Sequence, residues 1–155
     1  MRQLVAMTLL VAFAGCLQTN QDTGTVPDIA TRDTLVAHAA ELAAAISRRD
    51  AEGAARLVST GDNVVYVSDG VPIRGRDYRT ALGQFYAAMR TIGFSWDSSD
   101  VRLVDSNTGV FTGWARIAMT DTAGRQSIDR AVFTLVYARR NTAWEMVTAH
   151  KTTLR

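Results

Sequence analysis

The stretch RAVFTLVYARRNTAWEMVTAHKT, residues 130–152, contains two alternating, largely apolar segments separated by the polar turn RRNT. Branched and aromatic residues dominate both segments, which predicts an antiparallel hairpin. Two similar segments precede it, so we expect strands over 99–105, 110–120, 126–139 and 143–152, joined by the turns SNTG, DTAG and RRNT. The second half of the chain therefore predicts a long antiparallel meander.

Helical patterns occupy the first half. Apolar residues recur at helical spacing from Asp33 to Ile46, and Asp50 can cap a short second helix in AEGAARLVS. A third helix is expected from Asp77 to Ile92, with Gly93 as its stop. Between the second and third helices, NVVYVS followed by Asp-Gly predicts a short hairpin. Helices followed by a meander predict an α+β domain whose helices cover one face of the sheet.

The N-terminus differs from the rest of the chain. Arg2 is followed by an apolar run over 4–14 and then by Gly15 and Cys16, which is typical of an export signal. The run is too short for a stable membrane-spanning helix, which needs about 20 apolar residues. The small residues before the cysteine resemble a bacterial lipoprotein signal, in which the cysteine carries the lipid, although Phe13 replaces the usual leucine.

The sequence thus predicts three parts: a signal peptide over 1–15, a lipid-attached flexible tether over 16–33, and a folded domain over 34–155. Lipidation at Cys16 would place the domain in the cell envelope, anchored to a bacterial membrane. Cys16 is the only cysteine, so no disulfide can form within the chain.

Composition excludes several function classes. The formal net charge is only +2 and the arginines are scattered, so we expect no nucleic-acid partner. The two histidines lie far apart in the sequence, and the domain has no cysteine, so we expect no metal site. No glycine-rich phosphate loop is present, and we expect no cofactor.

Two local patterns carry a resemblance to a known family. SDGVPIRGRDY, residues 68–78, resembles the glycine, Gly-Arg pair and acidic helix start of the nuclear transport factor 2-like superfamily, especially its SnoaL-like branch. The final hairpin is similar to that of the same superfamily, with Trp144, His150 and Thr152 in the matching places. The resemblance covers 34–155 and also extends to the association domain of calcium/calmodulin-dependent kinase.

This resemblance implies a cone, in which a strongly bent, cystatin-like antiparallel sheet packs on three N-terminal helices and leaves a pocket between them. Pockets of this kind are the usual ligand sites. Members of the superfamily include isomerases, cyclases, dehydratases, binding modules and assembly domains, so the resemblance leaves the activity open. It also implies a homodimer that buries the outer face of the meander.

Side-chain alternation predicts which residues line the cone. On the last strand, Trp144, Thr148 and His150 should share the inner face. On the preceding strand both faces are mostly apolar; the family pattern favours Arg130 inward, with Asp129 as the rival. The complete set of expected ligand-binding residues is Tyr66, Tyr78, Phe85, Trp114, Arg130, Trp144, Thr148 and His150. Each aromatic residue in this set could instead be ordinary core.

Catalysis is an alternative to simple binding. A histidine facing a cavity can act as a general base near neutral pH, which makes His150 one candidate and Asp129 another. A structural role is favoured for His150, because a general base needs a partner that orients its ring and no carboxylate partner is evident. His38, on the first helix, could meet His150 across the cavity or lie at the edge of the core.

Two functions follow from these patterns. The first is a lipid-anchored domain that binds a small, largely apolar molecule. The second is a cofactor-free isomerase, cyclase or dehydratase with His150 or Asp129 as base and a tyrosine as proton donor.

Overall fold

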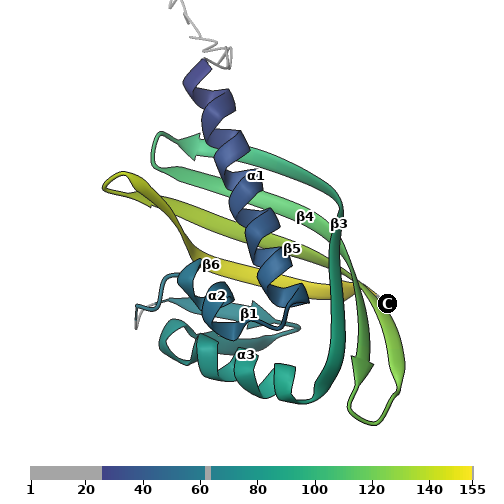
Figure 1. The fold of residues 1–155 in the computed structure, drawn as a ribbon. Helices are drawn as coiled ribbons and strands as arrows, with labels where there is room; N and C mark the ends of the chain where they lie inside the picture. The colour runs from purple at the N-terminus through teal and green to yellow at the C-terminus, as the bar shows by residue number, and fades with distance from the viewer. Residues whose placement is uncertain (1–25, 62–63, 155) are drawn as a thin grey trace, which may run out of the picture.

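The computed structural model describes residues 26–61 and 64–154, and the expected signal peptide and Cys16 lie outside these residues. Three helices and a helical turn accompany six strands (Figure 1). In chain order the elements are α1 (Val26–Ser47), α2 (Ala51–Arg56), β1 (Val65–Ser68), β2 (Val71–Arg74), η1 (Gly75–Asp77), α3 (Tyr78–Ala87), β3 (Met89–Asp105), β4 (Thr108–Asp121), β5 (Gln126–Arg140) and β6 (Ala143–Leu154).

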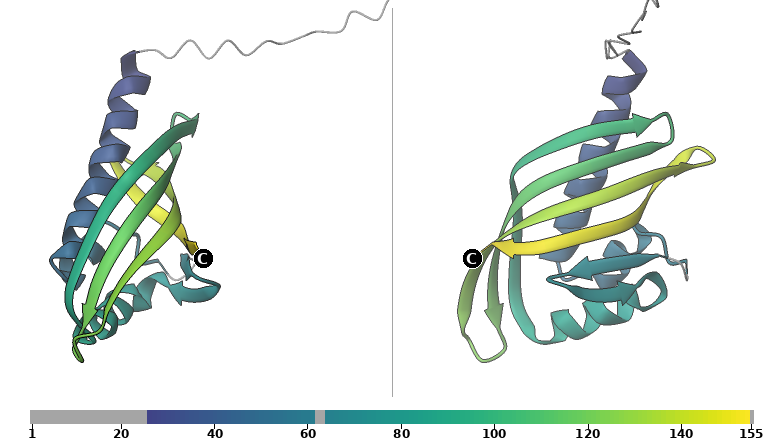
Figure 2. Two further views of the ribbon diagram at one scale, coloured as in Figure 1. Left: turned by 90° about the vertical axis from the view of Figure 1, so that its right-hand side faces the viewer. Right: turned by 180° about the vertical axis from the view of Figure 1, so that it is seen from behind.

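The six strands form one curled sheet in the order β2-β1-β6-β5-β4-β3. β3 to β6 make the expected antiparallel meander, which curves around α1 (Figure 2). β1 joins β6 in parallel, with Tyr66 opposite Ala149, so the sheet is mixed rather than wholly antiparallel. The predicted α+β class with helices on one face of a bent sheet is confirmed.

Short-range signals predicted two local features correctly. Asp50 caps α2, since its carboxylate accepts a hydrogen bond from the backbone N–H of Gly53 at 2.7 Å. Asp69 and Gly70 form the turn between β1 and β2 with φ of 50° and 84°. Both angles are positive, as the tight hairpin turn requires.

Two element boundaries differ from the sequence expectation. α1 begins at Val26, so 26–33, expected as tether, forms its first turns. α3 ends at Ala87, and β3 begins at Met89. Ile92 lies opposite Met119 in the β3–β4 ladder, so the prediction that it belongs to the third helix is wrong. An apolar residue at helical spacing also suits a strand, and here pairing with β4 prevails.

The main core lies between α1 and the concave face of the sheet. Leu35, Ala39 and Leu42 on α1 pack against Phe111 of β4 and Leu135 of β5. A second cluster, formed by Tyr86, Ile92, Ile117 and Ala131, continues the core beside α3. No described helix has the length and apolarity needed to cross a membrane.

Candidate functional site

A cavity of about 390 Å³ lies between the concave face of the sheet and the helices. The size suits one small molecule. Most of its lining side chains are apolar or aromatic. The lining residues are Leu42, Ile46, Tyr66, Val67, Ser68, Ile73, Tyr78, Ala81, Leu82, Phe85, Tyr86, Ile92, Phe94, Ile117, Met119, Asp129, Phe133, Leu135, Met146, Ala149 and Lys151.

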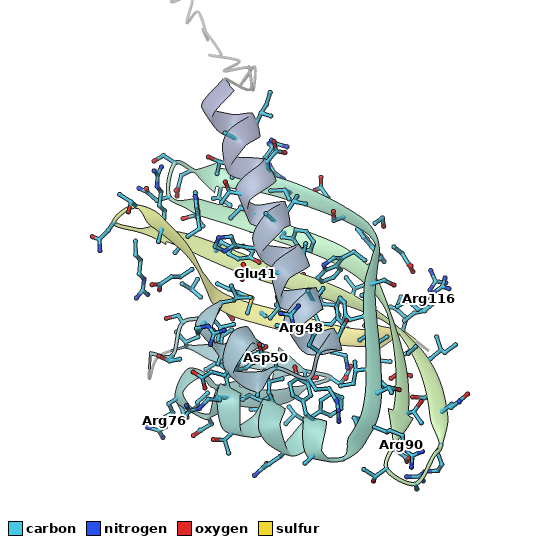
Figure 3. The ribbon with its side chains drawn as sticks, viewed as in Figure 1. Glu41, Arg48, Asp50, Arg76, Arg90 and Arg116 are labelled. Atoms are coloured by element: carbon cyan, nitrogen blue, oxygen red, sulfur yellow. The ribbon has the colours of Figure 1, made fainter. Side chains whose placement is uncertain are left out.

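Helices and strands supply opposite walls of this pocket. α3 contributes Ala81, Leu82 and Phe85 at helical spacing, which places all three on one face. Strands β5 and β6 contribute alternate residues, including Phe133 and Met146. Phe85 is 41% exposed, so this part of the pocket wall is reached by solvent. Charged side chains such as Arg76, Arg90 and Arg116 point away from the space between α1 and the sheet (Figure 3).

Tyr66 and Tyr78, both expected at the site, lie together in the pocket wall with their ring centroids 4.7 Å apart. The Tyr66 hydroxyl lies 2.9 Å from the carbonyl oxygen of Ser59 and 3.1 Å from that of Met146, and its one hydrogen is shared between the two acceptors. Burial, followed by the neighbouring Tyr78, raises the pKa of Tyr66 well above its usual range. Burial also raises the pKa of Tyr78 to about 12. Both phenols are therefore protonated at neutral pH and can only donate or accept hydrogen bonds, not act as bases.

Tyr86 has a buried hydroxyl with no hydrogen-bond partner among the described residues. Burial, then Tyr78 and Asp50, raises the pKa of Tyr86 above its usual range. An unpaired buried hydroxyl costs about 1–3 kcal/mol. Because protein atoms cover this hydroxyl, it lowers the stability of the folded state, and a ligand in the pocket does not reach it without local movement.

β5 turns Asp129, not Arg130, toward the pocket. Asp129 shares its face with Ala131, Phe133 and Leu135, all of which lie in the core or the pocket wall. Arg130 pairs with Arg116 and is exposed on the outer face of the sheet. The expectation that Arg130 points inward is wrong, because the odd-numbered residues of β5, such as Ala131 and Leu135, are the buried ones.

A bulge in β6 separates the two rings that alternation placed together. Val136 pairs with Thr148 and Tyr137 with Met146, so Val147 has no partner and the alternation shifts by one residue. Trp144 is therefore 8% exposed in the core, whereas His150 is exposed on the outer face. The expectation that Trp144 and His150 share the inner face is wrong.

The other expected site residues lie away from the cavity. Thr148 follows the bulge, and its hydroxyl donates to the carbonyl oxygen of Val65 at 2.6 Å, where it links β6 to β1. Trp114 is 39% exposed on the outer face, because Phe111 and Ala115 take the inner positions of β4. Of the expected ligand-binding set, only Tyr66, Tyr78 and Phe85 line the pocket.

His38 does not meet His150. Its ring lies edge-on to that of Tyr137 with centroids 6.0 Å apart, at the margin of the core. Its Nδ1 atom is buried without a hydrogen-bond partner in the described part of the chain. Within residues 26–61 and 64–154, no group of three or more histidine, cysteine or acidic side chains could hold a metal ion.

Lys151 is the one positively charged lining residue, and sequence reasoning missed it. It follows the bulge with Ala149, and both side chains face the pocket. Simple alternation from Trp144 assigned Lys151 to the outer face. Phe94 of β3 and Met119 of β4 also line the pocket, and their regular alternation with exposed neighbours could have identified them.

Comparison with known proteins supports this architecture. The sequence profile described as "SnoaL-like domain" matches residues 36–153. No curated protein matches the chain in sequence.

Solved structures provide a second comparison. A hexachlorocyclohexane dehydrochlorinase, LinA type 2, superposes with a TM-score of 0.74 at 13% identity, covering 83% of this chain and 88% of that one. A nuclear transport factor 2-like protein from Salmonella enterica gives 0.72 at 13% identity, covering 82% and 93%. A cystatin-like protein from Caulobacter vibrioides gives 0.68 at 19% identity, covering 79% and 89%. At such low identities these matches show the fold alone.

Proposed function

The chain belongs to the SnoaL-like domain family. We propose that it binds one small, largely apolar molecule in the pocket, without evident catalysis. The observation that carries this proposal is the composition of the pocket wall, in which aliphatic and aromatic side chains predominate. Transfer of apolar ligand surface from water contributes about 25 cal/mol per Å². With such a wall, the affinity for a ligand should rise with its buried apolar area and with the fit of its shape.

Blocking the cavity tests this proposal. Ala81 lines the pocket from α3, so Ala81→Trp should fill it and weaken binding of the neutral fluorescent probe N-phenyl-1-naphthylamine at least ~10-fold. Ala87 lies on the same helix, is exposed and does not line the cavity, so Ala87→Trp is the matched control. Equal probe binding by both variants, or no binding by the unaltered chain, would refute the proposal.

A cofactor-free isomerase, cyclase or dehydratase is the second candidate function, favoured by the carboxylate of Asp129 in the pocket wall. Asp129 would act as the general base, with a pocket tyrosine as hydrogen-bond donor. His150 does not face the pocket, which leaves Asp129 as the base in this alternative.

Exchange of a substrate proton separates the two functions. We would incubate the chain with 2-acetylnaphthalene in D₂O and follow its α-protons by NMR. Enzymatic exchange that is lost in Asp129→Asn, with probe binding retained, would support catalysis. No exchange above the buffer rate would favour binding alone.

We also propose that the chain is exported and held in the cell envelope by a lipid on Cys16. The support is the sequence pattern of Arg2, the apolar run and the small residues before Cys16. Expression in a bacterium followed by mass spectrometry should find a mature N-terminus at Cys16 carrying a diacylglyceryl group. Cys16→Ala should abolish this mass, and an unprocessed chain would contradict the anchor.

A further inference from the structure

Lys151 is the only lysine in the chain and lies in the wall of an otherwise largely apolar pocket. Its side chain is 23% exposed, and the carboxylate that it contacts, Asp69, is 43% exposed, so the stem is largely covered while the ion pair lies near the surface. Lysine side chains more often extend freely into solvent. Specific contacts are therefore needed to hold this side chain against the pocket wall.

A set of short contacts holds the ammonium in place. Lys151 Nζ donates to Oδ2 of Asp69 at 2.6 Å and to Oγ1 of Thr153 at 3.0 Å. Asp69 is itself fixed, because its Oδ1 accepts the backbone N–H of Thr153 at 2.6 Å and its Oδ2 accepts the Thr153 hydroxyl at 3.1 Å. The backbone N–H of Asp69 also donates to the carbonyl oxygen of Lys151 at 2.9 Å. The cation is thus positioned before any ligand arrives.

One ammonium hydrogen is left for a ligand. A lysine ammonium has three donors, and Asp69 and Thr153 accept two of them. Among the described residues, the third hydrogen has no acceptor. Since Lys151 lines the cavity, a polar atom of a bound molecule can reach this donor.

Nearby charges indicate which polar atom fits. Asp69 compensates the charge of Lys151, and the carboxylate of Asp129 adds a negative charge to the same wall. An anionic ligand group would therefore meet a net negative surrounding. A neutral carbonyl oxygen can accept the third hydrogen without that repulsion.

We propose that the pocket takes a neutral, largely apolar molecule with one carbonyl group, whose oxygen accepts a hydrogen bond from the Lys151 ammonium. This proposal rests on the binding function proposed above and specifies its ligand class. The apolar wall holds the body of the molecule, and Lys151 fixes its orientation.

The test compares three naphthalenes of similar size as competitors of N-phenyl-1-naphthylamine on the full chain: 2-acetylnaphthalene, 2-ethylnaphthalene and 2-naphthoate. The ketone should bind ~10-fold more tightly than the hydrocarbon, as expected for a hydrogen bond from a charged donor. Lys151→Met keeps the apolar stem and should reduce this preference to within ~2-fold, measured as the ratio of the two affinities within the variant. Arg79→Met removes an exposed cation of α3, paired with Glu52, and is the matched control that should keep the preference.

Each result has a distinct meaning. No ketone preference, a preference that survives Lys151→Met, or tighter binding of 2-naphthoate than of the ketone would overturn the assignment while leaving apolar binding intact. Failure of the probe itself to bind would refute the binding function and the assignment with it. If Lys151→Met does not fold, the infrared carbonyl stretch of bound 2-acetylnaphthalene in the unaltered chain replaces it. A stretch lowered relative to that in hexane supports the hydrogen bond, and an unshifted one overturns it.

Discussion

Asp69 connects the hairpin turn to the last strand, and its contacts change its acidity. Its hydrogen bond from Lys151, followed by that from the backbone N–H of Thr153, lowers the pKa of its carboxyl group from 3.8 to about 2. The folded state therefore favours the ionised form. The resulting contribution to stability is complete above about pH 4 and is lost as the pH falls toward 2.

Asp69→Asn should reveal this contribution. Asparagine tolerates the positive φ of the turn, so the change removes the charge with little backbone strain. At neutral pH we expect the variant to be less stable by about 1 kcal/mol or less, because the pair is partly exposed. Urea unfolding between pH 7 and pH 2 should show the difference shrinking below about pH 4. A difference independent of pH would contradict the assignment of the low pKa.

At single residues, the sequence predicted local turns and helix caps better than it predicted which way a strand side chain faces. The Asp69-Gly70 turn and the Asp50 cap depend on a few adjacent residues, and both were predicted correctly. The orientation of Asp129 was not predictable by alternation, because both faces of its strand are mostly apolar. His150 was misplaced because no residue type marks the bulge at Val147.

At the level of elements, the boundary between α3 and β3 shows how tertiary pairing overrides a local pattern. Residues 89–92 continue the apolar spacing of α3, yet the backbone enters β3 at Met89 and pairs with β4. Ala88 is the C-cap of α3, where the backbone N–H contacts the carbonyl oxygens of Phe85 and Tyr86. The sequence predicted the existence and order of these elements, but the pairing partner that fixes the boundary lies far along the chain.

The short helix α2 depends on its first residue. Asp50→Ala should destabilise the domain by about 1 kcal/mol, because the backbone N–H of Gly53 loses its side-chain acceptor. Asp50→Asn is the control, since asparagine caps helices about as well as aspartate. Urea denaturation midpoints should order the chains as unaltered, then Asp50→Asn, then Asp50→Ala. Equal loss in both variants would mean that charge, not capping, is responsible.

For the whole molecule, the order of helices and strands was enough to predict the α+β class, because helices that precede an antiparallel meander in the sequence usually pack together on one of its faces. The parallel joining of β1 to β6 was not predictable, because nothing local in either strand specifies its partner. The side chains on the outer face of the sheet were only partly predicted, because alternation left the facing of β5 open and missed the bulge in β6. On this outer face, Trp114 lies beside Val132, and Ile128 and Leu154 are exposed nearby.

This outer face is the expected surface of a homodimer. Trp114→Glu places a charge beside Val132 and should convert a dimer into a monomer, because burying an unpaired carboxylate is costly. Val36→Glu changes an exposed apolar residue of α1, on the other side of the sheet, and should leave the dimer intact. Light scattering during size-exclusion chromatography measures both masses. A monomeric unaltered chain would show that the dimer prediction is wrong.

The β1–β6 ladder joins residues 66–68 to residues 149–151, which leave the ribosome long after the hairpin does. A nascent chain can form its helices and the β1–β2 hairpin early, but the hairpin has no neighbouring strand until β6 has been synthesised. Contacts this distant in sequence slow folding. The hollow between sheet and helices is consequently a late product of translation, and a chain truncated before β6 would expose the unpaired edges of β1 and β5 to aggregation.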